Sequence, residues 1–276
     1  MIEIRPCAGF DELQACVDLQ IATWGYDATD VVPRKIFRVA EHIGGQVIGA
    51  FDTERAASLD TPAAGSLVGF AMAWTGAKSG DRTHPARPYL HSHMLAVLPE
   101  YRNQGLGARL KWFQREDALN RGIGHMEWTF DPVEIKNAYL NLAKLGAVVC
   151  HYEVNFYGSS SSPLQGGLPT DRFVAEWRMD SPRVAAAREG RLADYRQTEG
   201  KIEIECRITV PAEIYAWKDS PATRDRALEL HRANREAFLD AFARGLAVVG
   251  YSRDTHGNGY FELGSRARLE ETLKRR

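Results

Sequence analysis

Hydrophobic positions recur along the first hundred residues with two spacings, which predict helices and strands. Apolar side chains lie three or four positions apart over residues 13–24 and again over 36–43, and this is the period of an amphipathic helix. Shorter apolar runs bounded by turn residues cover 46–51, 67–75 and 89–97. We expect a strand in each of these runs, preceded by a first strand at the N-terminus.

The same two patterns continue to the C-terminus. Up to residue 180 they predict a helix from about 105 to 120, a strand over 125–130, a helix over 132–146, and strands over 147–157 and 172–179. Beyond it they predict a short helix after Pro182, a strand near 202–210, a long helix over about 221–244, and strands around 246–251 and 259–263. A charged, solvated helix over 265–276 is expected at the end. A polar stretch with Pro62 and Gly65 is predicted to be an exposed hairpin connection, and the serine tract 159–162 a loop.

This order of elements predicts an α/β fold, α+β in the stricter sense, with a mixed, mostly antiparallel central sheet flanked by helices. The 276 residues exceed one average domain. We therefore expect a catalytic domain over 1–180 and a C-terminal α+β extension over 181–276. The extension would either dimerise the chain or cover a substrate site.

Composition excludes several classes of partner. Lys plus Arg number 35 and Asp plus Glu number 36, so no net positive field exists to attract nucleic acid or an anionic membrane. No apolar run approaches the roughly 20 residues that cross a bilayer. The four cysteines lie among apolar residues without CxxC spacing, which predicts buried thiols in a reducing, cytoplasmic location. We expect no metal.

The segment HSHMLAVLPEYRNQGLGARL, from His91 to Leu110, predicts an anion site. A strand ends in it, and Arg102, Gly105 and Gly107 occupy a turn that opens directly into a helix. Glycine lets a backbone approach a ligand closely, and the first amides of a helix, supported by the helix dipole, point at an anion. A plain tight turn would also use such glycines.

Two common phosphate loops do not fit this turn. No Gly-Lys-Ser/Thr follows the glycines, which excludes a P-loop, and Leu110 stands where a dinucleotide fingerprint needs its third glycine. Arg102-x-x-Gly105-x-Gly107 after a Val-x-Pro strand end instead resembles the coenzyme A pyrophosphate loop of the GNAT superfamily of N-acyltransferases. The order of elements over roughly residues 1–157 resembles that family as well.

The resemblance implies a coenzyme A site made mainly of backbone. The pyrophosphate would be held by the amides of the turn and the first helical residues, namely Arg102, Asn103, Gln104, Gly105, Leu106, Gly107 and Ala108. The pantetheine would pair like an added strand with the edge formed by Leu95, Ala96 and Val97. Arg109 and Lys111 would either reach the outer phosphate or remain solvated at the surface.

Acyl transfer to an amine needs a base, and histidine is the side chain whose ordinary pKa of roughly 6.5 lies near the working pH. Alternation along the strand places His91 and His93 on one face, together with Leu95 and Val97. The run HSHMLAV is similar to the paired histidines of arylalkylamine N-acetyltransferases, which relay a proton from the amine through water. His93 is the preferred base, His91 is its partner or a half-exposed surface residue, and Glu127 on the next strand is the alternative base.

The leaving thiolate calls for an acid. GNAT enzymes usually place a tyrosine four residues before the glycine that ends the following helix, and Leu142 occupies that position here. Tyr139, one turn earlier, would replace it. Otherwise the thiolate would leave unaided, because thiols are weak bases beside alkoxides.

Four further segments, WTFDP, NAYLNLAKLGA, NFYG and GLPTDRF, resemble a subfamily of bacterial and archaeal GNAT enzymes. Some members are associated with N-acylamino-acid racemases and are thought to succinylate amino acids. The resemblance implies acetyl-CoA or succinyl-CoA as donor, a primary amine of a small molecule, above all an amino acid, as acceptor, and a homodimer as an option. Arg172 would bind a carboxylate of either substrate, or else form a local pair with Asp171.

Two other functions remain open on the sequence. Leu142 at the acid position suits a coenzyme A-binding sensor that has lost the chemistry. A glycine turn between strand and helix also suits a nicotinamide-dependent oxidoreductase, which NAD would stabilise and coenzyme A would not.

Overall fold

The computed structural model describes residues 1–58, 63–79, 85–158, 160 and 162–274. Contacts between Cα atoms divide the chain into two compact units, of which unit 1 comprises residues 1–126 with 161–163 and unit 2 comprises 127–160 with 164–276. The division into domains at residue 180 stays a prediction. Pro62 of the polar connection and Ser159 and Ser161 of the serine tract lie outside the described residues.

Four strands form the sheet of unit 1, in the order β1-β2-β3-β4. Their bounds are Ile2–Pro6 for β1, Gln46–Asp52 for β2, Leu67–Lys78 for β3 and Arg87–Val97 for β4. All three pairings are antiparallel. Ala71 of β3 pairs with Ile48 of β2 on one side and with Leu95 of β4 on the other, which defines the register of β2, β3 and β4.

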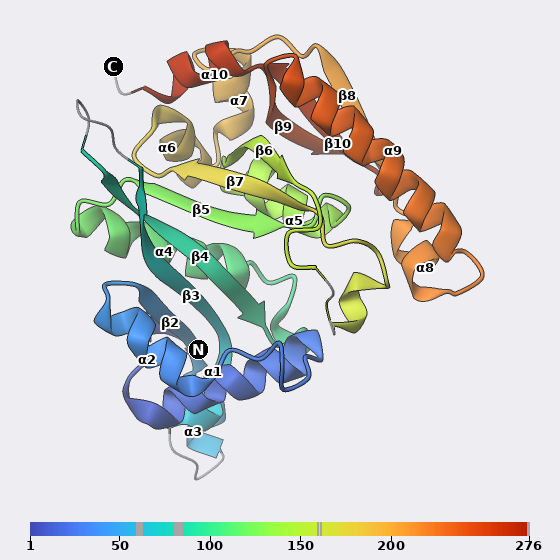
Figure 1. Cartoon of the computed structure of the whole chain (residues 1–276). Coiled ribbons are helices and arrows are strands. Elements are labelled where there is room, and N and C mark those ends of the chain that lie inside the picture. Colours follow the sequence, from blue (N-terminus) through green and yellow to red (C-terminus); the bar gives the residue numbers. More distant parts are fainter. Residues whose placement is uncertain (59–62, 80–84, 159, 161, 275–276) are drawn as a thin grey trace. The chain divides into compact units, whose positions relative to one another are not determined.

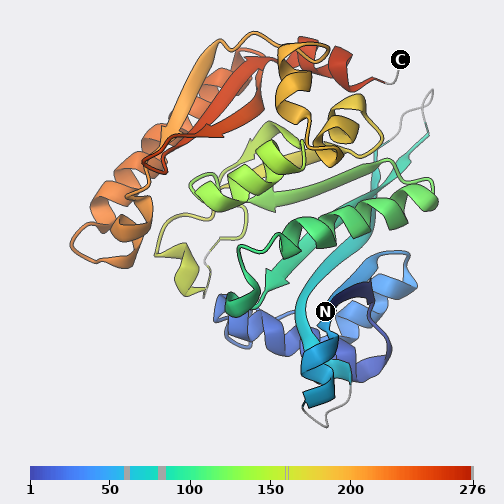
Figure 2. The same cartoon turned by 180° about the vertical axis from the view of Figure 1, so that it is seen from behind.

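Helices cover both faces of this sheet. α1 (Gly9–Trp24) and α2 (Arg34–His42) lie on the face seen in Figure 1, and α4 (Leu106–Asn120) lies on the face seen in Figure 2. The connection from β2 to β3 contains a short helix, α3 (Thr53–Ser58), and a 3-10 turn, η1 (Ala63–Ser66), where the sequence predicted only a hairpin connection.

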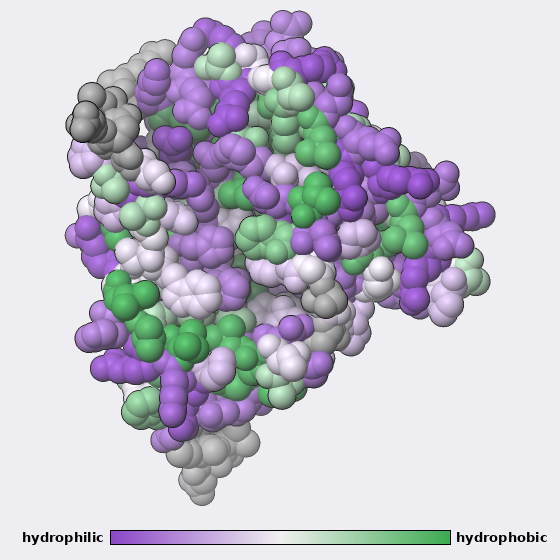
Figure 3. Space-filling model, in the orientation of Figure 1, coloured by the Kyte–Doolittle hydropathy of each residue, from purple (hydrophilic) through white to green (hydrophobic). Residues whose placement is uncertain are grey.

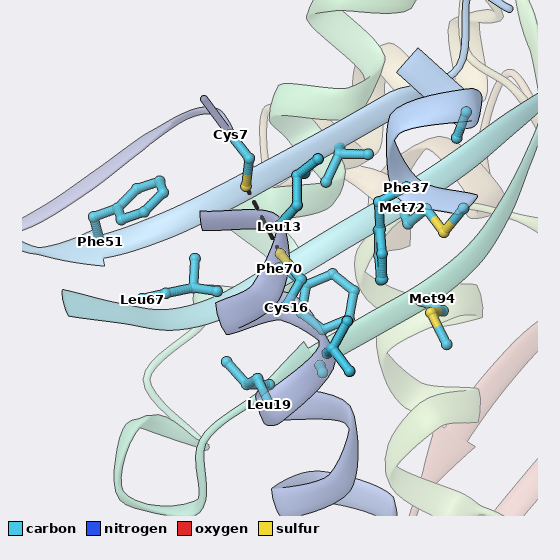
Figure 4. Packing of buried hydrophobic residues seen from close by; sticks show 14 residues of the cluster. Cys7, Leu13, Cys16, Leu19, Phe37, Phe51, Leu67, Phe70, Met72 and Met94 are labelled. Atoms are coloured by element: carbon cyan, nitrogen blue, oxygen red, sulfur yellow. Dashed lines mark hydrogen bonds between the residues drawn. The ribbon is translucent and has the colours of Figure 1, made fainter. Parts of the chain in front are cut away.

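Each face of the sheet has its own hydrophobic core. In the first core, Leu13 and Cys16 of α1 and Phe37 of α2 pack with Phe70 and Met94 of the strands (Figure 4). The second core joins α4 to the opposite face and contains Ile48, Ala50, Val68, Ala71, Leu106 and Leu110. Full burial of one such large side chain contributes about 1.5–3 kcal/mol, so the two cores hold the helices to the sheet.

Unit 2 is built on strands in the order β5-β7-β6-β9-β10-β8. Their bounds are His125–Phe130 for β5, which begins in unit 1, Val148–Glu153 for β6, Arg172–Arg178 for β7, Cys206–Val210 for β8, Leu246–Arg253 for β9 and Gly259–Ser265 for β10. β6 pairs with β7 and β9, and β10 pairs with β9 and β8, all antiparallel.

The helices of unit 2 are α5 (Ile135–Ala138), the π-helix η3 (Tyr139–Lys144), α6 (Pro182–Arg188), α7 (Leu192–Gln197), α8 (Ile214–Asp219), α9 (Arg224–Ala243) and α10 (Arg266–Leu273). The long helix α9 packs on β6, β8 and β9. Its Phe238 meets the rings of Phe173 and Phe261 with centroids 4.7 and 5.3 Å apart. These aromatic contacts tie α9 to the strands.

The expected fold class is confirmed, with a mostly antiparallel sheet flanked by helices, but several local predictions are wrong. Residues 132–146 do not form one α-helix, because Leu145 N donates to Leu140 O, five residues back, and winds the end into the π-helix η3. The C-terminal helix is not fully solvated, since Leu269 and Leu273 on one side of it are buried. Cys206 is only half-buried, whereas the other three thiols are buried as expected.

Candidate functional site

β4 leads through a short turn into α4, and this turn is the predicted anion site. After Val97 the chain makes a 3-10 turn, η2 (Pro99–Tyr101), and α4 begins at Leu106. Asn103 and Gly105 have φ of 61° and 75°, in the left-handed region that favours glycine. A Cβ at Gly105 would meet no atom within 4 Å, so backbone conformation and not space explains the glycine.

The first turn of α4 presents backbone donors. Its first intrahelical bond runs from Arg109 N to Gly105 O at 3.0 Å, so the amides of Leu106, Gly107 and Ala108 have no partner within the helix. The N-cap Gly105 has no side chain that could accept from them. Because the helix dipole places about half a positive charge at this end, the amides form a site that suits a phosphate.

The polar side chains of the turn hold its backbone in place. Arg102 Nε donates to Val97 O at 3.0 Å, and Gln104 Nε2 donates to Glu100 O at 3.0 Å. Arg109 is exposed, and its Nη2 donates to Ile2 O at 3.0 Å. Since a guanidinium has five donors, both arginines keep donors for a ligand.

A β-bulge interrupts β4 just before the turn. Met72 of β3 pairs with Met94, whereas the next residue, Ala73, pairs with Ser92. His93 is therefore an extra residue, and it has no pairing partner on β3. A bulge of this kind re-aims the side chains around it and bends the strand.

The bulge sends the histidines and the end of the strand to different faces. His93 stacks on Trp74, which packs on the core of α1 and α2, with ring centroids 4.5 Å apart and an interplanar angle of 19°. The His91 ring lies 6.2 Å from that of His93. Leu95 and Val97 instead pack on the α4 core. The prediction that all four residues share a face is wrong, because simple alternation does not allow for an extra residue.

The edge of β4 that was expected to pair with pantetheine contains Leu95, Ala96 and Val97. One edge of this segment pairs with β3, where Leu95 lies opposite Ala71. Ala96 is 2% exposed and packs in the first core with Met94. The pairing with pantetheine stays a prediction.

Burial changes the chemistry expected of His93. Burial, with a smaller contribution from the neighbouring His91, lowers the pKa of His93 to about 4. The imidazole is therefore neutral at physiological pH, and it accepts a proton less readily than a histidine with the ordinary pKa of roughly 6.5.

Lys111 is neither a phosphate ligand nor a surface residue. It is 2% exposed, and its Nζ donates to Ser92 Oγ at 2.7 Å between α4 and β4. Ser92 Oγ donates in turn to Gln114 Oε1 at 3.1 Å. Burial holds the pKa of Lys111 well below its ordinary value. The sequence did not reveal this because a lysine next to a glycine turn is usually solvated.

Residues 26–146, which include β4, the turn and α4, match the model of the acetyltransferase (GNAT) family. This part of the chain is therefore similar to the GNAT family of acetyltransferases. The match covers the turn that the sequence singled out and ends at Gly146. A search of curated proteins finds no match to the chain.

Three of the solved structures that resemble part of this chain are the following. The ribosomal-protein-S18-alanine N-acetyltransferase from Escherichia coli has 15% identity and a TM-score of 0.46, and the comparison covers 65% of this chain and 94% of that one. NAA60 from Arabidopsis thaliana in complex with acetyl-CoA has 14% identity and a TM-score of 0.48, and the comparison covers 64% of this chain and 99% of that one. An N-acetyltransferase from Staphylococcus aureus Mu50 has 14% identity and a TM-score of 0.47, and the comparison covers 65% of this chain and 99% of that one.

The alternative base and the candidate acid of the GNAT reaction lie in unit 2. Glu127 is on β5 and is 6% exposed. Tyr139 begins the π-helix η3, half-buried, with Lys144 Nζ 5.4 Å and the Arg253 guanidinium 5.9 Å from its ring centroid. Leu142, at the usual GNAT tyrosine position, is 1% exposed and belongs to the core. Leucine has no proton to donate, so the role of an acid stays a prediction for Tyr139.

Arg172 forms the local contacts that were one of its two expected outcomes. Its Nη1 donates to Asp171 O at 2.9 Å, its Nη2 donates to Gln165 Oε1 at 3.1 Å, and its guanidinium lies 5.2 Å from the ring centroid of Tyr157. The Asp171 carboxylate is not its partner. Binding of a substrate carboxylate by Arg172 stays a prediction.

Asp171 is the residue that sequence reasoning missed most clearly. It is fully buried, and Arg235 of α9 donates to its two oxygens at 2.6 and 2.8 Å. Tyr152 OH and Asn155 N also donate to it, at 2.7 and 2.9 Å. Burial alone would raise the pKa of Asp171, but these hydrogen bonds outweigh burial and leave it lowered. Its partner Arg235 lies 64 positions away in the sequence, so a local sequence pattern does not reveal the pairing.

Unit 1 contains the two histidines of β4, the turn and the first turn of α4, which follow one another along the chain. Glu127, Tyr139 and Arg172 lie in unit 2, on three different elements. Among the described residues no helix is both long and apolar enough to cross a membrane.

Proposed function

We propose that this chain is an acyl-CoA-dependent N-acyltransferase that moves an acetyl or succinyl group to a primary amine of a small molecule, above all an amino acid. One observation carries the proposal. The free amides of Leu106, Gly107 and Ala108 open the helix that comes after the bulged strand, and this strand presents His91 and His93 on the side of Trp74. An anion site and a proton acceptor on adjoining elements suit a phosphate-bearing thioester and an amine.

The neutral imidazole of His93 defines its part in this reaction. A group with a pKa of about 4 is a poor acceptor for the proton of a free ammonium, whose pKa is roughly 10. It becomes a better one after the amine nitrogen has attacked the thioester carbon, because the nitrogen is then positively charged and acidic. His93 would take that proton directly or through a water. Tyr139 would protonate the leaving thiolate, or the thiolate would leave unaided.

The proposal also includes a cytoplasmic location and a reaction without a metal. It further includes a homodimer. α2 and the residue after it leave Ile36, Val39 and Ile43 exposed at 38%, 49% and 50%. Figure 3 shows hydrophobic residues gathered over this part of unit 1. Apolar surface of this kind supports a contact with a second protein chain. Light scattering of the wild type and of Val39→Glu would test it, with a dimer expected only for the wild type.

The deciding experiment measures thiol release from acetyl-CoA and, separately, from succinyl-CoA across a panel of L- and D-amino acids, arylalkylamines and polyamines. Release with one pairing would establish the activity and name both substrates. Tight coenzyme A binding without release from any pairing would favour the sensor. Thermal stabilisation by NAD without stabilisation by coenzyme A would favour the oxidoreductase and overturn the proposal.

A further inference from the structure

Unit 2 contains a groove along α9 that none of the predicted site residues lines. It has a volume of about 420 Å³ and is lined by Pro169, Asp225, Leu228, Glu229, His231, Arg232 and Arg235. Cavities of a few hundred Å³ are of the size that holds small molecules. Six of these residues lie on α9, and their spacing of one to three positions keeps them on one side of the helix.

The inner end of the groove is polar and buried. His231 is 2% exposed, its Nε2 makes no hydrogen bond, and the nearest Asp171 oxygen is 3.8 Å away. Arg235 is fixed by its two bonds to the carboxylate of Asp171. This end of the groove is therefore held in place by Arg235, and one imidazole nitrogen in it makes no hydrogen bond.

Stability alone does not account for this cluster. Taking charged groups out of water is costly, and well-packed apolar residues often stabilise a fold as well as a buried ion pair does. A buried imidazole nitrogen without a hydrogen bond adds a further cost. Such groups beside a groove are typical of sites that bind a ligand.

The rim of the groove offers charges of both signs. Asp225 and Glu229 lie one helical turn apart, and Arg232 follows Glu229 by three residues. All three are exposed, and across the described parts of the chain no ion pair or hydrogen bond engages their side chains. Leu228 and Pro169 supply apolar surface in the same groove.

We propose that this groove binds a small, free α-amino acid with an apolar side chain. The ammonium group lies between Asp225 and Glu229, the carboxylate meets Arg232, and the side chain packs on Leu228 and Pro169. An α-amino acid bears an ammonium and a carboxylate on the same carbon, so one small ligand can satisfy both signs of charge on the rim. The inference concerns unit 2 alone and does not depend on acyl transfer.

Calorimetric titration of the full chain with L-leucine, L-methionine and L-phenylalanine tests the proposal. At least one of the three should bind. Its N-acetyl derivative, which lacks the positive charge, and its decarboxylated amine, which lacks the negative one, should each bind at least 10-fold more weakly. Absence of binding by all three amino acids at 10 mM, or equal binding of either derivative, would overturn the proposal.

Charge-neutral variants locate the site. Arg232→Gln and Glu229→Gln should each weaken binding of the amino acid at least 10-fold. Arg226→Gln and Glu236→Gln are matched controls, because both residues are exposed on α9 and neither lines the groove. Affinity of the controls should stay within twofold of the wild type. An equal loss in the control variants, with unchanged circular dichroism, would contradict a site in this groove.

Turnover measurements distinguish the two sources of such a ligand. If the amino acid is the acyl acceptor, Arg232→Gln raises KM for it at least 10-fold and changes kcat little. If it is an effector, it alters the rate with a different amine, and Arg232→Gln abolishes that effect. Both results support the groove. Binding without any acyl transfer would leave the groove standing and remove the proposed function.

Discussion

His93 and Lys111 lie on the two sides of β4, and burial lowers the pKa of both. The consequences differ. A neutral imidazole next to Trp74 can accept a proton from a reacting nitrogen, so its burial suits a reaction. The buried Lys111 amine donates to Ser92 behind the strand and lies away from that chemistry, so its burial is a cost to stability.

Replacement of His93 tests the reaction. We expect His93→Ala to lower turnover by about 100- to 10,000-fold, the range for loss of a general base, and to leave coenzyme A affinity unchanged. His42→Ala is the matched control, because His42 is exposed on α2, and it should turn over like the wild type. Thiol-release kinetics and calorimetric binding measure the two effects. Full activity of His93→Ala would remove the histidine from the mechanism.

Replacement of Lys111 tests the cost of burial. Methionine has a similar length and no charge to desolvate, so we expect Lys111→Met to raise the free energy of unfolding by about 1 kcal/mol. Lys111→Ala should lower it by about 2 kcal/mol, because it leaves a cavity. Urea unfolding of the two variants gives the comparison. A loss of stability in both would mean that the bond to Ser92 outweighs desolvation.

At the scale of elements, α4 combines packing with ligand binding. Leu106 and Leu110 fasten it to the sheet on one side, while its first amides stay available at the end. Because Ala108 is the third residue of the helix, its position allows the charge at this end to be changed without disturbing the core.

Ala108→Glu should separate folding from binding. An acidic residue in the first turn of a helix favours the helix by about 0.3–1 kcal/mol through the dipole, so thermal stability should be kept or raised. The same charge repels a phosphate, and we expect coenzyme A affinity to fall at least 10-fold. Ala108→Gln has the same size without the charge and should lose much less. Calorimetry and thermal unfolding measure both quantities. Equal affinities of the two variants would place the phosphates elsewhere.

Periodicity predicted most elements of unit 1 to within a few residues, because each has one buried face. It predicted the glycine turn as well, since Gly105 needs a positive φ that few other residues adopt. It could not predict the bulge at His93, which inserts a residue without changing the apolar pattern. Nor could it predict the π-helix at Tyr139 or the pairing of Asp171 with Arg235, because tertiary contacts decide these features.

At the scale of the whole molecule, the net charge of −1 does not reveal that two histidines have lowered pKa values. Burial is the main cause that lowers the pKa of His93 and of His231, one in each unit. In the unfolded chain both take up a proton near pH 6.5, whereas the folded chain resists it. Acidification therefore favours unfolding before the carboxylates begin to titrate.

We expect the free energy of unfolding to decrease as the pH falls from about 6.5 towards 4. His93, with a folded pKa of about 4, would contribute a loss of about 3 kcal/mol over this interval. The contribution of Asp171, whose pKa is lowered, is lost only below about pH 4. Urea unfolding at pH 7, 6 and 5 measures the slope, and His93→Gln should flatten it. An equal slope in that variant would contradict the assignment.

The extra residue at His93 gives β4 one position that its pairing with β3 does not need. Removal of this one position would restore an unbroken pleat and leave every pair with β3 in register, so that Ser92, Leu95 and Val97 stay on the α4 side of the sheet. A scan of single deletions along β4 should therefore find the fold least disturbed by loss of His93, because a deletion elsewhere turns the residues between it and the bulge to the other face. Substitutions at His93 should also remain folded. Related chains are then expected to vary here in the number of residues as well as in their kind.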